Sequence, residues 1–218
     1  MLRSVLAESR SSHRLVHSSV NFKFWVNGNV PDVDVVRPRR CPCCGGPSRP
    51  LGEGLALHGH GVRLRQMRGP PRPGFRPELV EVATRRYVCL HCTAVVVVAP
   101  ALLLPRKYFS AAAIGWALAL FGLARRSAAD VRRVVSPWPH VGATAARTWA
   151  SLHRWARAVR ERRLFAGTRP CPDSLTLRQV AAHAAQSLAA HAAAEHTALV
   201  LHDRAFFGAE QLAMGSTP

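Results

Sequence analysis

The first half of the chain carries hydrophobic and polar positions in the alternating order of β-strands. Residues 57–66 alternate in this way, and the runs 79–89 and 93–98 are rich in valine. Short runs of alternating or β-branched residues predict strands. Residues 69–74 read Gly-Pro-Pro-Arg-Pro-Gly, which excludes regular structure. We therefore expect a long two-stranded arm with a loop at residues 69–74, followed by a buried strand.

The N-terminal residues show a weaker pattern. Residues 1–20 are rich in serine and arginine and have no clear period, so we expect them to be unstructured. Residues 21–26 read Asn-Phe-Lys-Phe-Trp-Val and predict a short strand. The Asn-Gly pair at residues 27–28 predicts a turn after that strand.

Beyond residue 109 the hydrophobic residues recur at helical spacing. Three helices are predicted, over residues 110–122, 127–136 and about 143–163. The second begins at a Ser-Ala-Ala-Asp sequence typical of a helix N-terminus. A further helix, rich in alanine and histidine, is predicted over residues 175–196, and its apolar side suits packing or dimerisation. Residues beyond 208 are expected to fray.

These patterns predict an α+β protein. Paired cysteines at 41/44 and 89/92 are typical of zinc ribbons. We therefore expect a zinc-ribbon β arm, followed by an all-α region in helix-turn-helix order and by a C-terminal helix. The expected segments are a disordered start with a short strand, a zinc-ribbon β domain, a helix-turn-helix-like helical domain, and a linker with the Ala/His-rich helix. Their ranges are 1–36, 37–109, 110–163 and 164–218.

The cysteine spacing supports the metal assignment. Cys41 and Cys44 form one Cys-x2-Cys pair, and Cys89 and Cys92 form another. Two such pairs can place four thiolates around one tetrahedral zinc ion, which is a closed structural site. The alternatives are ordinary thiols, or disulfides in a secreted protein. We see no signal peptide, which disfavours disulfides and favours a reducing cytoplasm.

Several neighbouring residues offer alternative ligands. Cys43 is the spare thiol of the first pair, and His58, His60 or His91 would replace a cysteine in an altered site. Exposed strand or loop histidines are the simpler interpretation of these three.

Charge indicates the partner. Thirty Lys and Arg against twelve Asp and Glu give a net charge of +18, which attracts a polyanion. We expect binding of double-stranded DNA and a nucleoid-associated location. Basic patches also bind anionic lipid, but a membrane partner is not expected. The apolar run at 94–104 is broken by Pro100, and the run at 111–123 is too short to cross a bilayer.

The order of the helices predicts where DNA binds. In a helix-turn-helix module the last helix enters the major groove by its N-terminal part. Basic amphipathic helices are often just solvated surface, and the connection at 136–142 is longer than usual. The predicted DNA contacts, from arm and helices together, are Arg63, Arg65, Arg85, Arg86, Arg132, Arg133, Thr144, Arg147, Thr148, Ser151 and Arg154.

Four short strings carry a resemblance to a known family. They are Cys-Pro-Cys-Cys-Gly at 41–45, His-Gly-His-Gly at 58–61, Arg-Arg-Tyr-Val-Cys-Leu-His-Cys at 85–92 and Leu-Leu-Pro-Arg-Lys-Tyr at 103–108. Together they resemble the N-terminal zinc-ribbon region of bacterial insertion-sequence transposases, and bacterial proteins with such a ribbon before a helix-turn-helix. The resemblance implies binding of DNA, including transposon ends. The chain departs from the pattern by its extra Cys43 and by lacking a glycine after Cys92.

The sequence predicts binding without catalysis. A transposase of the usual kind holds two metal ions with three carboxylates on an RNase-H-like fold. After the third predicted helix only four acidic residues remain, in an alanine-rich stretch: Asp173, Glu195, Asp203 and Glu210. Two alternatives remain. One is a truncated or split transposase subunit that acts with a separate catalytic chain. The other is a structural or RNA-binding zinc protein with a helical protein interface. A homodimer through the C-terminal helix is a further expectation.

Overall fold

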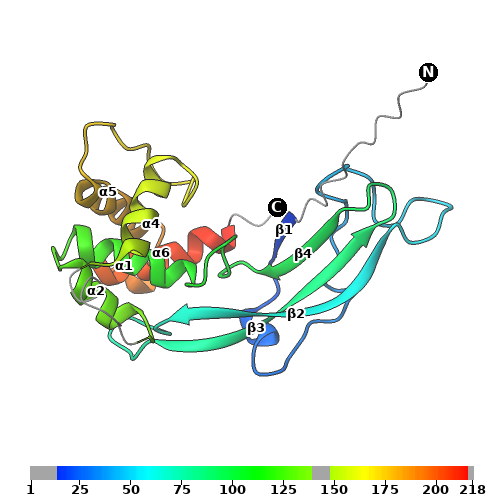
Figure 1. The fold of residues 1–218 in the computed structure, drawn as a ribbon, viewed down its shortest axis with the longest axis horizontal. Helices are drawn as coiled ribbons and strands as arrows, with labels where there is room; N and C mark the ends of the chain where they lie inside the picture. Colours follow the sequence, from blue (N-terminus) through cyan, green and yellow to red (C-terminus); the bar gives the residue numbers. More distant parts are fainter. Residues whose placement is uncertain (1–13, 139–147, 216–218) are drawn as a thin grey trace, which may run out of the picture. The chain divides into compact units, whose positions relative to one another are not determined.

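The computed structural model describes residues 14–138 and 148–215 (Figure 1). These ranges contain both a sheet and helices, which is consistent with the α+β class. The strands are β1 (Arg14–Ser18), β2 (Leu57–Gly69), β3 (Glu78–Cys89) and β4 (Val95–Pro100). The α-helices are α1 (Ala111–Gly122), α2 (Ala128–Val135), α4 (Ala150–Arg160), α5 (Leu177–Ala189) and α6 (Leu201–Gly215). Two 3-10 turns, η1 (Phe22–Trp25) and η2 (Ala194–His196), complete the set.

The chain divides into two compact units. The first contains the described residues up to 65 together with 83–100, and it holds the paired cysteines. The second contains residues 66–82 and the described residues from 101 to 215, and it holds the five α-helices of the described ranges. The tip of the predicted arm, residues 66–82, therefore belongs to the helical unit.

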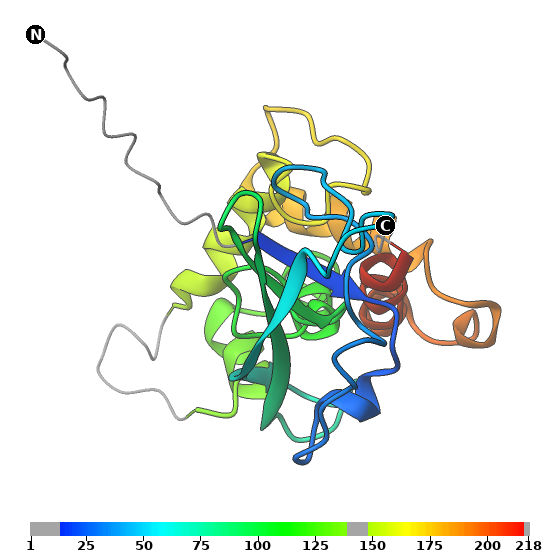
Figure 2. The same cartoon turned by 90° about the vertical axis from the view of Figure 1, so that its right-hand side faces the viewer.

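The strands form one four-stranded sheet in the order β1-β4-β3-β2. β4 runs antiparallel to β3, and β1 runs parallel to β4, with Arg14 opposite Val96 (Figure 1 and Figure 2). The two strands expected for the arm, β2 and β3, are neighbours in this sheet, and β4 and β1 extend it. The valine run of β4 explains this: Val96 and Val98 are buried on one face of the strand.

The N-terminal segment differs from the sequence prediction at two places. Residues 14–18, expected to be unstructured, form β1. Residues 21–26, expected to be a strand, contain the 3-10 turn η1. The Asn21 side chain accepts a hydrogen bond from the Lys23 amide at 3.0 Å, which caps the turn. Trp25 is fully buried, and its indole N–H donates to the Val20 carbonyl at 3.2 Å.

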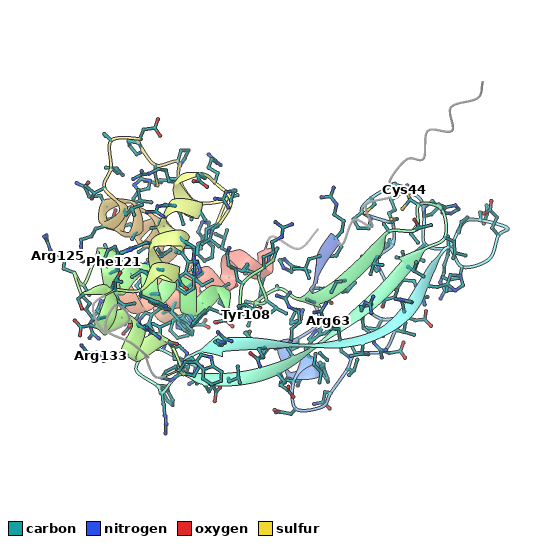
Figure 3. All side chains as sticks on the ribbon, in the orientation of Figure 1. Cys44, Arg63, Tyr108, Phe121, Arg125 and Arg133 are labelled. Carbon is teal, nitrogen blue, oxygen red and sulfur yellow. The ribbon has the colours of Figure 1, made fainter. Side chains whose placement is uncertain are left out.

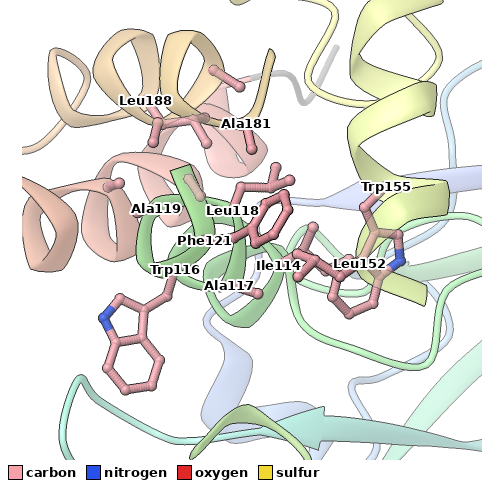
Figure 4. Packing of buried hydrophobic residues seen from close by; sticks show 14 of the residues in the cluster. Ile114, Trp116, Ala117, Leu118, Ala119, Phe121, Leu152, Trp155, Ala181 and Leu188 are labelled. Atoms are coloured by element: carbon pink, nitrogen blue, oxygen red, sulfur yellow. The ribbon is translucent and has the colours of Figure 1, made fainter. Parts of the chain in front are cut away.

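Helix α1 is the centre of the second unit (Figure 4). Every residue from Ala111 to Phe121 is buried, although the sequence predicted one apolar face. A helix that is hydrophobic on all sides is typical of a protein core. The Ser110 hydroxyl accepts from the Ala113 amide at 3.0 Å and fixes the predicted start of α1. Figure 4 shows Leu152 and Trp155 of α4, and Ala181 and Leu188 of α5, around this helix.

The C-terminal residues are more ordered than predicted. Helix α5 ends at Ala189, and residues 201–215 form the separate helix α6. Fraying beyond Gly208 was therefore a wrong expectation, since Ala209 and Ala213 are buried. The apolar side of α5 is also covered within the chain. A homodimer through this helix would have to use other residues.

Helices α2 and α4 test the helix-turn-helix prediction only in part. Helix α2 begins after Ser127, whose hydroxyl accepts from the Asp130 amide at 3.1 Å, as predicted. The helix predicted from 143 does not continue through Trp149, which has extended dihedral angles. The Trp149 ring instead packs edge-on against Phe109 and Trp155, at centroid distances of 5.6 and 4.9 Å. Residues 143–147 lie outside the described ranges. No helix within those ranges is long and apolar enough to cross a membrane.

Candidate metal centre

Four cysteine sulfur atoms converge in the first unit. The Sγ atoms of Cys41, Cys44, Cys89 and Cys92 all lie within 4.8 Å of one another. Cys41 and Cys92 are 3.7 Å apart at sulfur, and Cys44 and Cys89 are 3.8 Å apart. A tetrahedron with metal–sulfur bonds of about 2.3 Å has edges of about 3.8 Å, whereas a disulfide bond is about 2.0 Å long. The four cysteines therefore form a group that can hold a metal ion, and the geometry is compatible with structural zinc.

The first pair sits in a tight turn. The Cys41 amide donates to the Gly46 carbonyl at 2.8 Å, and the Gly45 amide donates to the Cys41 carbonyl at 2.9 Å. Gly45 has a φ of +73°, which few residues other than glycine adopt readily. The Cys43 amide points to the Cys41 sulfur at 3.4 Å. This turn folds the backbone around Cys41 as a metal knuckle requires.

The second pair lies at the connection between β3 and β4. Cys89 is the last residue of β3, and its amide donates to the Ala94 carbonyl at 3.1 Å. No glycine follows Cys92, but Thr93 takes the left-handed conformation with a φ of +58°. The Thr93 hydroxyl donates to the Cys92 carbonyl at 2.7 Å. Thr93 thus occupies the place where a knuckle usually has glycine, and the departure does not disrupt the ligand geometry.

The four thiols do not ionise alike. Burial favours a higher pKa for Cys41, but the amides of Cys44 and Cys43 and the neighbouring thiols lower it to about 7. The Ala94 amide favours a low pKa for Cys92, but desolvation and the other three thiols raise it to about 12. Closely spaced thiolates repel one another, so a cation is needed to hold all four in the ionised form.

The alternative ligands stand outside this group. Cys43 is half-buried beside it, and His60 and His91 are exposed. The His58 ring is hydrogen-bonded to the Leu55 carbonyl. Among the described residues, no second set of three or more histidine, cysteine or acidic side chains lies close enough to bind a metal.

The predicted DNA contacts of the sheet have unequal exposure. Arg63 is exposed on β2 (Figure 3), whereas Arg65 and Arg86 are half-buried. The Arg85 Nε–H donates to the Pro31 carbonyl at 2.8 Å. This hydrogen bond joins Pro31 to β3, and a contact of Arg85 with DNA would compete with it.

The predicted contacts of the helices are distributed over α2 and α4. Arg132 is half-buried, and Arg133 forms an ion pair with Asp130. Thr148 and Arg154 are exposed, and Arg154 donates to the Ser151 hydroxyl at 3.2 Å. Thr144 and Arg147 lie outside the described residues. The predicted helix had these residues in its interior, whereas in the structure α4 starts at Ala150, so Ser151 and Arg154 lie in its first turns and Thr148 precedes it.

Sequence reasoning missed a group of exposed rings in the second unit. Tyr108 and Trp138 are both exposed, and the guanidinium of Arg68 lies over each ring. Tyr108 ends the Pro-Arg-Lys-Tyr string, so its aromatic and basic character was visible in the sequence. The contact with Arg68 and Trp138 was not visible there, because the three residues are far apart along the chain.

Comparisons with protein-family models, with curated proteins and with solved structures gave no match to this chain. The resemblance to insertion-sequence transposases therefore stays a prediction that rests on the short strings alone.

Proposed function

We propose that this chain is a zinc-dependent, non-catalytic DNA-binding protein. The observation that carries the proposal is the convergence of Cys41, Cys44, Cys89 and Cys92, in a chain of net charge +18. In biological terms it would serve as a transcriptional regulator or as the recognition part of a mobile-element system.

The ligand set supports zinc in a structural role. Four thiolates are typical of zinc, and the sulfur separations suit its bond lengths. A site closed by four protein ligands leaves no position for water or substrate, which supports binding over metal-assisted hydrolysis. The ion would tie the 41–46 turn to the connection between β3 and β4, so its removal should loosen the first unit.

Charge and residue type support nucleic acid as the partner. Nearly all the basic residues are arginine, whose planar guanidinium suits phosphate and guanine contacts. Arg63 offers an exposed cation in the first unit, and Arg154 offers one in the second. Phosphate contacts of this kind give affinity that falls steeply with salt.

The test is a fluorescence-anisotropy titration with duplex DNA across a salt series, with and without a zinc chelator. Genomic fragments are compared with a random duplex. We expect a steep salt dependence and a preference for one fragment that the chelator removes. Binding with no preference would reduce the proposal to charge-driven attraction, and no binding at low salt would refute it.

Matched cysteine variants sharpen the test. Cys41→Ser removes one ligand, whereas Cys43→Ser changes an adjacent thiol that lies outside the group. We expect Cys41→Ser to reproduce the effect of the chelator and Cys43→Ser to bind as the wild type does. If the two variants had the same DNA affinity and the same fragment preference, the proposal that zinc organises the DNA-binding protein would be contradicted.

A further inference from the structure

The second unit has an exposed ring surface next to arginine. Tyr108 is 60% exposed and Trp138 is 47% exposed, whereas the other four tryptophans of the chain are at most 7% exposed. Single exposed rings are common, but two exposed rings that contact one guanidinium form a contiguous surface, which is a feature of interaction sites. The Arg68 guanidinium carbon lies 4.8 Å from the centre of the Tyr108 ring and 5.4 Å from the centre of the Trp138 ring.

Backbone hydrogen bonds hold Arg68 and Tyr108 in place. The Arg68 amide donates to the Tyr108 carbonyl at 2.7 Å, and the Ser110 amide donates to the Arg68 carbonyl at 3.0 Å. The next residue, Phe109, packs edge-on against Trp155 of α4 at 5.1 Å between ring centroids. The loop that carries Tyr108 is therefore fixed to a strand on one side and to a helix on the other.

The Arg68 guanidinium is incompletely satisfied. One terminal nitrogen donates to the Gln66 side chain at 3.1 Å. Its Nε is buried, and within the described ranges it has no hydrogen-bond partner. Besides the hydrogen bond to Gln66, the guanidinium has cation–π contacts with both rings, and aromatic rings and arginine side chains also bind nucleobases.

Cations gather around the same loop. Lys107 precedes Tyr108, and desolvation together with the charges of Arg163, Arg154 and Arg106 lowers its pKa. One acid lies nearby, since Glu161 forms an ion pair with Arg163. These four basic side chains repel one another, and a polyanion bound between them would reduce this electrostatic repulsion.

We propose that Arg68, Tyr108 and Trp138 form a stacking platform for an unpaired base of a nucleic acid strand. Arg106, Lys107, Arg154 and Arg163 then bind the flanking phosphates. Exposed aromatic and arginine planes next to basic residues are the usual combination for single strands, because every base presents a face for stacking. Bases inside a duplex are already stacked on each other and cannot use such a platform. This proposal rests on the proposed function only in that the chain must bind nucleic acid.

The experiment compares single strands with a duplex. Labelled oligonucleotides of about 12 nucleotides, in DNA and in RNA, are titrated beside a blunt duplex of the same length. The full-length zinc-loaded chain is compared with Tyr108→Ala, Trp138→Ala and Trp138→Phe. Phe24→Ala is the matched control, because Phe24 is an exposed ring with the Lys23 amino group at 5.1 Å, in the other unit.

We expect each alanine variant to bind single strands about 5- to 100-fold more weakly, with duplex binding changed less than 2-fold. Trp138→Phe keeps a ring and should recover most of the affinity. Phe24→Ala should bind as the wild type does. Trp138 also gives a direct readout, since base stacking should quench the fluorescence of the only exposed tryptophan, and Trp138→Phe should lose this quenching.

Three outcomes would overturn the platform. Unchanged binding of single strands by the alanine variants would do so, and so would an equal loss for single strands and duplex. A wild type that binds no nucleic acid would overturn it together with the proposed function. Zinc-dependent duplex binding with unaffected variants would refute only the platform. If the chain bound single strands through these rings but did not bind duplex DNA, only the proposed binding of double-stranded DNA would be refuted. The comparison of DNA with RNA oligonucleotides shows which of the two nucleic acids supplies the base.

Discussion

Replacement of Gly208 by alanine should destabilise the helical unit, although alanine favours helices. In α6, a Cβ at position 208 would lie 1.8 Å from the carbonyl oxygen of Leu188 and 2.6 Å from its carbonyl carbon. Ordinary carbon–oxygen contacts are about 3.3 Å, so α6 and the end of α5 would have to separate by about 1.5 Å. The obstacle is backbone, which cannot rotate away.

The expected cost follows from two opposing effects. Overpacking of this kind costs about 3 kcal/mol or more when backbone must shift. The higher helix propensity of alanine stabilises the helix by about 1 kcal/mol relative to glycine. We expect a net loss of about 2 kcal/mol in the free energy of unfolding, and a Tm lower by roughly 6 °C for a unit of this size.

The assay is thermal unfolding followed by circular dichroism at the helical band. Gly215→Ala is the control, because Gly215 lies in the same helix and its added Cβ would have no neighbour within 4 Å. We expect the control to stay within about 0.5 kcal/mol of the wild type. If Gly208→Ala were as stable as Gly215→Ala, the close packing of α5 on α6 would be wrong.

Three further outcomes are expected. Zinc analysis of the reconstituted chain should give one ion per chain, and Cys89→Ser should lose it. Ser127→Ala should lower the free energy of unfolding by about 1 kcal/mol in urea, because the Asp130 amide at the start of α2 loses the Ser127 hydroxyl as its hydrogen-bond acceptor. The buried Tyr87 hydroxyl donates to the Val33 carbonyl at 2.6 Å, so Tyr87→Phe should cost about 1 kcal/mol near neutral pH. Desolvation raises the Tyr87 pKa to about 12, above the usual value of about 10, so this advantage over phenylalanine should be complete below pH 10 and should shrink as the pH rises through 12.

The four converging cysteines could be picked out from the sequence because the spacing within each pair is local. Each Cys-x2-Cys pair forms a local turn that brings its two sulfur atoms together. A four-sulfur site then needs only that the two turns lie next to each other in the fold. The conformation of Thr93 could not be predicted, since glycine usually fills that position. Its hydroxyl and the tight β3–β4 connection allow a positive φ in threonine.

Strands and helices were predictable where the pattern was long and periodic. Residues 57–66 and 79–89 showed this for β2 and β3, and Ser110 and Ser127 marked the starts of two helices. The strand β1 was missed because it is short and depends on parallel pairing with the distant β4. Tertiary contact, and not local preference, creates such a strand.

The C-terminal helices show the limit of composition. A run of alanine and glycine suggests a weak or fraying segment when read alone. In the structure the same small residues let helices approach closely, as Gly208 does against Leu188. The approach depends on the partner backbone, which no local pattern reveals. The extended Trp149 is a similar case, because its contacts with Phe109 and Trp155 override the helical period.

The proposed zinc site can be examined by X-ray absorption at the zinc edge, on the reconstituted chain. If the four cysteines of one chain bind zinc and organise the first unit, we expect one zinc ion with four sulfur ligands at about 2.3 Å, and no nitrogen or oxygen neighbour. A first shell with nitrogen or oxygen ligands, or a chain that takes up no stoichiometric zinc, would contradict it.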